Sequence, residues 1–180
     1  MPSVTFGGTI SQDATVGTLA WSNASNAASS DDTYATVTIR GSSSEITRYL
    51  TMTGSNGLPT PSPGYYNNID GIEIFIEGYS EDGGALTGSA TSYSAKLLSS
   101  SALAGNDLGL GAIVLTKRSN DLTYSIGSSI ETWGLSQIQL ELVNGFAIAF
   151  YDTGLKEAYL KIDRLYATIS YTETLLPSND

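Results

Sequence analysis

The side chains whose types and spacing could support chemistry in this sequence are carboxylates. Asp31 and Asp32 form one adjacent pair, Glu81 and Asp82 form another, and Asp107 lies in the stretch GNDLGLG. Loop carboxylates can bind Ca²⁺, and two carboxyl groups about 5–10 Å apart can hydrolyse a glycosidic bond. The acids lack the spacing of an EF-hand loop, and acids are frequent throughout the chain. We therefore interpret them as solvated turn residues and expect neither a metal site nor a cofactor.

Other catalytic groups are missing from the composition. The 180 residues include no histidine and no cysteine. This excludes disulfides, thiol nucleophiles, imidazole bases and Cys/His metal sites, and it leaves any serine nucleophile without its usual base. We expect a protein that is not an enzyme.

Aromatic residues offer candidates for binding. Trp21 and Trp133 stand beside small polar residues, and they could either form a sugar-stacking platform or plug the ends of a core. We place both in the core, because a large buried ring contributes strongly to packing. Tyr65 and Tyr66 follow a proline-rich loop and are the better surface pair, since exposed tyrosine is enriched at interfaces. We expect them to contact a partner or a glycan.

The first sixteen residues, MPSVTFGGTISQDATV, allow two interpretations. Val4, Phe6, Ile10 and Val16 make the segment too apolar for a free tail and too interrupted for an obvious core strand. It could add to the edge of a neighbouring sheet as an arm, with Phe6 contacting the partner. Alternatively, it pairs within its own sheet as a first strand.

The elements that would position these residues are short strands. Apolar residues alternate with polar ones in many segments, which are separated by Gly, Ser, Asn, Asp and Pro clusters, as in antiparallel sheets with one solvated face. Such segments are residues 35–39, 48–52, 72–76, 93–97, 122–126, 146–150 and 158–171. Together with the two tryptophans, the residues expected in the core are Ile72, Ile74, Ile76, Phe146 and Ile148. Glu73, Phe75 and Glu77 should occupy the opposite face.

Two segments depart from simple alternation. The phase of the last strand slips at Asp163–Arg164, which indicates either a β-bulge or a strand that crosses between sheets. In residues 136–144, Ile138, Leu140 and Leu142 alternate like a strand. However, Ser136 with Gln139 resembles a capping box, so we expect one short helical turn there.

These patterns predict an all-β fold, an antiparallel β-sandwich of jelly-roll type. A chain of this length can bury roughly 70% of its unfolded surface without disulfides. We expect a single sandwich domain over residues 17–173, preceded by the arm or first strand of residues 1–16 and followed by a loose tail of residues 174–180.

The charge and hydropathy of the chain limit its partners. Eighteen acids against eight bases give a formal net charge of −10. Scattered bases in an acidic chain argue against nucleic-acid binding. No run approaches the roughly 20 apolar residues of a membrane span, and the N-terminus lacks the features of a signal peptide. We therefore expect no membrane partner and synthesis in a cytoplasm.

Several stretches together resemble a β-sandwich family of virion proteins from tailed bacteriophages and prophages. They are WSNASNAASSDDTYATV (21–37), IDGIEIFIEGYS (69–80), TWGLSQIQ (132–139), NGFAIAF (144–150) and LKIDRLYATISYT (160–172). The chain departs from the family's GF-IP turn, where it has TGSNGLPTPSPGYYNN instead, so this loop could be a specific contact element.

The resemblance implies a non-enzymatic virion protein, made in the host cytoplasm and assembled as a homo-oligomer on phage capsid or tail proteins. The expected role is a capsid decoration or cement protein on the outer surface, where an acidic module avoids the packaged DNA. The alternative is a receptor- or glycan-binding module of the phage tail, and a third possibility is a carboxylate-based glycan hydrolase.

Overall fold

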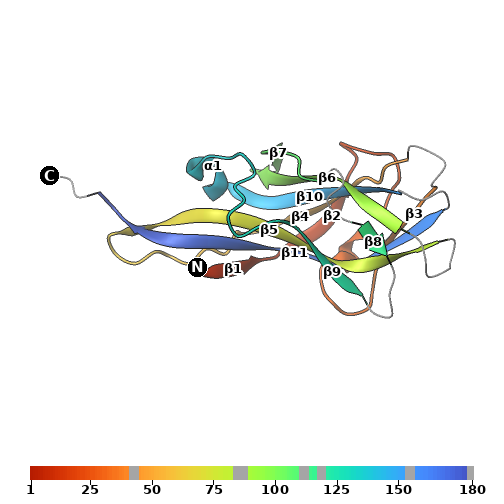
Figure 1. Ribbon diagram of the computed structural model, residues 1–180, viewed down its shortest axis with the longest axis horizontal. Coiled ribbons are helices and arrows are strands. Elements are labelled where there is room, and N and C mark those ends of the chain that lie inside the picture. Colours follow the sequence, from red (N-terminus) through yellow and green to blue (C-terminus); the bar gives the residue numbers. More distant parts are fainter. Residues whose placement is uncertain (41–44, 83–88, 110–113, 117–120, 153–156, 178–180) are drawn as a thin grey trace.

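Two antiparallel sheets packed face to face make up the molecule (Figure 1). The structure is a computed structural model that describes residues 1–40, 45–82, 89–109, 114–116, 121–152 and 157–177. Helical structure in these ranges is confined to two short segments, η1 (Ala24–Ala27) and α1 (Gln137–Glu141).

The first sheet is built around two long strands that lie side by side. Its strands are β1 (Ser3–Phe6), β3 (Ala35–Ile39), β5 (Tyr65–Asp82), β9 (Leu122–Gly127) and β11 (Ala158–Leu175). β5 pairs with β11 on one side and with β9 on the other, while β1 and β3 pair with different parts of the far side of β11.

The second sheet is centred on β10. Its strands are β2 (Thr9–Asp13), β4 (Tyr49–Thr53), β6 (Ser89–Ser99), β7 (Ala102–Ala104), β8 (Val114–Thr116) and β10 (Val143–Asp152). The order is β2, β4, β10 and β6, and both β7 and β8 pair with the outer side of β6.

The strand order confirms the predicted jelly-roll. The first sheet contains the sequence β3–β11–β5–β9, and the second contains β4–β10–β6–β8. Eight strands that are arranged as two interlocked Greek keys in two sheets define this topology. Because the chain passes between the sheets repeatedly, segments far apart in sequence meet at each end of the sandwich.

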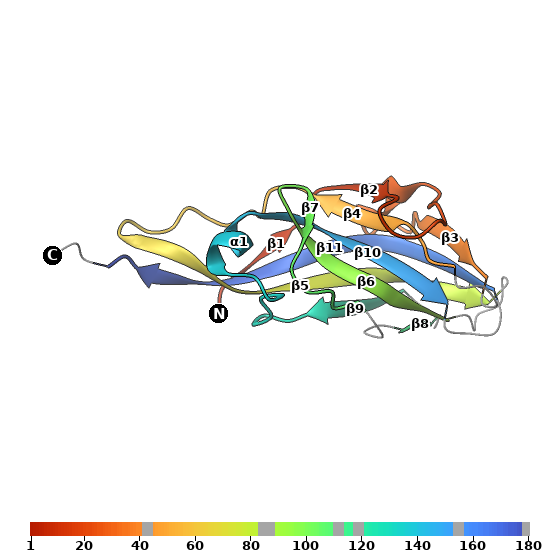
Figure 2. The same ribbon diagram turned by 90° about the horizontal axis from the view of Figure 1, so that it is seen from above.

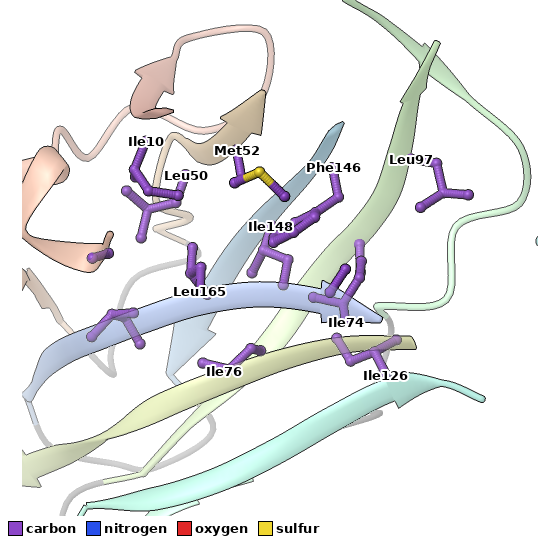
Figure 3. Close-up of a cluster of buried hydrophobic side chains, with 14 of the residues drawn as sticks. Ile10, Leu50, Met52, Ile74, Ile76, Leu97, Ile126, Phe146, Ile148 and Leu165 are labelled. Carbon is purple, nitrogen blue, oxygen red and sulfur yellow. The ribbon is translucent and has the colours of Figure 1, made fainter. Parts of the chain in front are cut away.

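The core lies between the sheets and contains the seven residues expected there, each at most 3% exposed: Trp21, Ile72, Ile74, Ile76, Trp133, Phe146 and Ile148. Figure 3 shows Ile74 and Ile76 of β5 facing Ile148 and Phe146 of β10. Full burial of one such side chain contributes roughly 1.5–3 kcal/mol. The alternation of β5 therefore fixes its register, since a shift by one residue would bury its acids.

The phase slip in the last strand is a β-bulge. β11 stays paired with β5 on both sides of Asp163, and the register shifts between Ile162 and Arg164. The extra residue lets Leu160 and Leu165, which have opposite parity, both face the core. The strand therefore does not cross to the other sheet.

The short helix forms where the capping residues predicted it. The Oε1 atom of Gln139 accepts hydrogen bonds from the backbone N–H of Ser136 at 3.0 Å and from its hydroxyl at 2.9 Å. Leu140 is buried, whereas Ile138 and Leu142 are exposed, because a helix turns about 100° per residue and places only one of the three toward the core. The 3-10 turn η1 lies in the Ser- and Asn-containing segment that precedes β3.

The N-terminal segment follows the second of its two interpretations, and the last strand runs further than expected. β1 pairs with β11 and β2 with β4 of the same chain, and Phe6, opposite Ala167, is only 1% exposed. The prediction that Phe6 contacts a partner is therefore wrong, because its ring packs between the chain's own sheets. The expected loose tail also starts too early, since β11 continues to Leu175, which pairs with Tyr65.

The long strands extend beyond the sandwich as a two-stranded ribbon. β9 pairs with β5 only at residues 73–78, and β1 pairs with β11 only at residues 167–170. Beyond these positions, residues 65–69 and 171–175 form a ladder with each other. Both views show the start of β5 and the end of β11 projecting at one end of the molecule (Figures 1 and 2).

Candidate functional site

Exposed large hydrophobic side chains gather where the ribbon projects. Among the described residues they are Met1, Tyr65, Tyr66, Leu103, Ile130, Ile138, Leu142, Leu175 and Leu176. Most lie in three segments, residues 54–71, 128–145 and 170–177. We call these three segments together the apolar end. Met1 precedes β1, which lies beside this part of β11, and Leu103 lies on β7, whose neighbour β6 pairs with the start of β10. The first two segments are in close contact, since a Cβ on Gly71 would lie 2.5 Å from the backbone nitrogen of Ile130.

The edge of β5 is closed by side chains and a loop where β9 ends. The backbone N–H of Ile72 donates to the carbonyl of Glu131 at 3.0 Å, and the indole Nε1 of Trp133 donates to the carbonyl of Ile72 at 2.8 Å. Further along β5 toward the tip of the ribbon, the backbone of the buried residue Ile69 is hydrogen-bonded by the carboxamide of Gln137 from α1. The apolar end is thus attached to the sheet through hydrogen bonds that replace a neighbouring strand.

The loop of residues 54–64 supports the ribbon. The backbone N–H of Ser62 donates to a carboxylate oxygen of Glu173 at 3.0 Å, and Asn67 donates to the carbonyl of Pro59 at 2.7 Å. The backbone N–H of Leu176 donates to the carbonyl of Gly64 at 2.8 Å. These contacts hold the proline-rich loop along the ribbon and fix the position from which the tyrosine pair extends.

Tyr65 and Tyr66 are placed as the sequence suggested. They are 40% and 38% exposed, whereas the other aromatic residues of the described chain are buried or half-buried. Trp21 and Trp133 are buried, and each indole donates to a backbone carbonyl, that of Arg48 and that of Ile72 respectively. The tryptophans therefore do not form a platform for sugars.

The outer face of β5 and β11 is occupied by side chains that pair with one another. Phe75 stacks on Tyr166 with ring centroids 4.8 Å apart and planes inclined by 8°, and the guanidinium carbon of Arg164 lies 4.4 Å from the centre of the Tyr166 ring. Glu77 accepts a hydrogen bond from the hydroxyl of Ser30 at 2.8 Å. The side chains of this acidic and aromatic face thus contact one another, whereas those of the apolar end are exposed to solvent.

A cluster of three carboxylates, not anticipated as a group, lies beside the bulge of β11. One carboxylate oxygen from each of Asp32, Asp121 and Asp163 lies within 4.8 Å of the others. The hydroxyl of Tyr34 donates to Asp121 at 3.1 Å, and the backbone N–H of Asp31 donates to Asp163 at 3.3 Å. Burial raises the pKa of Asp163, and the charges of Asp121 and Asp31 raise it further. Such a group of oxygens has the chemistry of a hard-cation ligand set.

The acids singled out in the sequence have other roles. Asp31 accepts hydrogen bonds within its own turn from Thr33 and Ser29. These bonds lower the pKa of Asp31, and the bond from the Thr33 hydroxyl has the largest effect. Glu81 lies 3.6 Å from the ammonium of Lys161. Asp107 accepts the backbone N–H groups of Ala95 and Gly109 at 2.9 and 3.0 Å. Only Asp32 of the sequence candidates belongs to the cluster, and the phase slip at Asp163 was the sequence signal for its centre.

Two comparisons with known proteins identify no relative of this chain. Neither the protein-family models nor the curated protein sequences contain a match to this chain. Within the described ranges, no helix combines the length and apolar character that crossing a bilayer requires.

Proposed function

We propose that this protein is a non-enzymatic structural component of a tailed-bacteriophage virion, and specifically a capsid decoration protein attached to the outer surface of the particle. The observation that carries the proposal is the apolar end. Single exposed hydrophobic residues are normal on a soluble protein, but a collection of them at one end marks an interaction surface.

Composition and fold support the same proposal. A chain without histidine or cysteine lacks the usual bases and thiol nucleophiles of hydrolases. A net charge of −10 suits an outer shell better than an interior filled with nucleic acid. Jelly-rolls are common in viral capsid and lectin domains, although a fold alone does not define a function.

The alternative is a receptor- or glycan-binding module of the phage tail, and the exposure of Tyr65 and Tyr66 favours it. An exposed tyrosine ring can stack on a pyranose ring, and both rings are held on a supported ribbon. Binding of the purified protein to a glycan array, lost in Tyr65→Ala and Tyr66→Ala variants but retained in Ser125→Ala, would establish this alternative.

The location of the protein on particles tests the proposal. Virions of the phage or prophage that encodes the chain are purified on a density gradient, quantified by mass spectrometry and labelled with an antibody. Decoration predicts a fixed copy number per particle and label over the capsid. Label restricted to the tail would select the receptor-binding alternative, and absence from purified particles would overturn both.

A further inference from the structure

The charged side chains of the apolar end are all acids. Asp70, Glu131, Glu141 and Glu173 lie in its three segments, which contain no lysine or arginine. Glu141 and Glu173 are exposed, and the other two are half-buried. The end therefore combines exposed apolar side chains with negative charge.

The apolar side chains of this end are more than marginally exposed. Ile138 is 75% exposed, Ile130 72% and Leu175 64%. Removing such area from water is favourable by about 25 cal/mol per Å², and the same area left in water contributes nothing to the fold. The exposed part of these side chains adds to stability only when another surface covers it.

The ribbon itself provides a second, independent indication. Two-stranded antiparallel ribbons are marginally stable in water without further packing. Residues 65–68 have no third strand beside them in the described chain. Hydrogen bonds with Pro59, Ser62 and Gly64 of the adjoining loop support this part of the ribbon, on both of its strands. A docked surface would supply the missing layer and could also pair with the open edge of the ribbon.

We propose that the apolar end docks onto a partner protein whose surface presents apolar pockets within a ring of lysine and arginine side chains. This inference rests on the proposed function only in placing that partner on the particle. Charge complementarity selects this occupant, because it steers association and fixes the register of an interface. A symmetric contact with a second copy is disfavoured, since each copy would bring four acids and no lysine or arginine.

A site-specific crosslink tests this docking. The full-length chain carrying Tyr66→p-benzoylphenylalanine is produced in cells that assemble the particle and is irradiated there, with Ser125→p-benzoylphenylalanine on exposed β9 as the control position. Peptide mapping then identifies both the partner and the residues of the partner that were joined. We expect a specific adduct from position 66, absent from position 125, at an apolar site flanked by lysine or arginine.

Two further substitutions test the two components of the surface. Adding Leu175→Ser should lower the crosslink yield by about tenfold, because it removes a large apolar contact. Adding Glu141→Lys should lower the yield, because it places a cation opposite the basic rim of the partner, whereas Glu157→Lys, an exposed acid outside the apolar end, should leave it unchanged. Circular dichroism and melting curves verify that each variant is folded.

The outcomes separate this inference from the proposed function. An adduct at a basic-rimmed apolar site supports the docking whatever the partner is, and the identity of that partner decides whether it is a virion protein. An adduct with a second copy of this chain, an adduct at a site without basic residues, or no adduct at position 66 would overturn the docking. In each of those cases the localisation on purified particles still decides the proposed function.

Discussion

The carboxamide of Gln137 forms a ring of two hydrogen bonds with the backbone of Ile69. The N–H of Ile69 donates to Oε1 at 2.9 Å, and Nε2 donates to the carbonyl of Ile69 at 2.7 Å. A side chain thereby satisfies both polar groups of a fully buried residue, as a paired strand would. It also anchors α1 to the base of the ribbon.

Truncation of Gln137 should destabilise the protein. Gln137→Ala leaves the N–H and the carbonyl of Ile69 without these partners, and we expect a loss of about 1–3 kcal/mol in the free energy of unfolding. Gln137→Glu keeps an acceptor but loses the donor, so it should also destabilise. Ile138→Ala, an exposed neighbour on the same helix, is the control for chemical denaturation. Equal stability of Gln137→Ala and wild type would contradict this role.

Ile74 tests the register of the central strand. It is fully buried and lies between Ala167 of β11 and Ile126 of β9. Ile74→Ala should cost about 2–5 kcal/mol in urea unfolding, because it leaves a cavity in the core. Ser125→Ala, on the exposed face of β9, should stay within about 0.5 kcal/mol of wild type. A loss below about half a kcal/mol for Ile74→Ala would contradict the assigned register.

Phe6 should act on stability rather than directly on binding. Its ring is buried, so Phe6→Ala is expected to cost about 3–5 kcal/mol, whereas Thr5→Ala, exposed on the same strand, should have little effect. Deletion of residues 1–12 removes β1 and most of β2, and it should abolish cooperative unfolding. A truncated protein that melts like wild type but no longer binds particles would instead favour an intermolecular arm.

Stability should depend on pH through Asp163. Its raised pKa means that the folded protein holds this proton more tightly than the unfolded chain, so the stabilisation is present below the unfolded value and is lost as pH rises through the folded value. Asp163→Asn mimics the protonated group and keeps an acceptor for Asp31. It should raise the Tm at neutral pH, by about 2–4 °C per kcal/mol gained, and the advantage should vanish near pH 4. A pH-independent difference in melting curves would argue against titration of Asp163.

Chelation should leave the Tm unchanged. A Ca²⁺ site usually takes six to eight oxygen ligands, whereas donors from Tyr34 and Asp31 already bind oxygens of the Asp32–Asp121–Asp163 cluster. The measurement compares melting curves with EDTA and with millimolar CaCl₂. A rise of Tm with calcium that Asp163→Asn removes would show that the cluster binds the ion after all.

Periodicity was sufficient to predict the core strands. In β5 the burial of Ile72, Ile74 and Ile76 follows directly from the twofold period of a strand, so these residues could be assigned from the sequence alone. In β10 the same period assigned Phe146 and Ile148 to the core, although residues 145–150 are all buried. Periodicity failed where the pairing of a strand is irregular. Tyr93 was expected in phase with Ala95 and Leu97, but the register of β6 shifts at Tyr93, which is only half-buried.

The candidate site was only partly predictable, because it depends on contacts between distant segments. The proline-rich loop marked Tyr65 and Tyr66 as surface residues. Nothing in the local sequence indicated that α1 and the end of β11 would place further exposed side chains beside them. The carboxylates of Asp32, Asp121 and Asp163 likewise converge through the crossings of a jelly-roll, and spacing along the chain carries no information about such convergence.

The pairing of β5 with β11 has a mechanical consequence. The two strands run side by side from Ala158 and Asp82, at the far end of the sandwich, to Leu175 and Tyr65 at the tip. A pulling force applied to one of the two strands at the tip and resisted by the other at the far end would act along the strands and load the hydrogen bonds between them in shear. Such bonds must fail together rather than one after another. An attachment at the ribbon would therefore pass tension along β5 and β11 rather than across them.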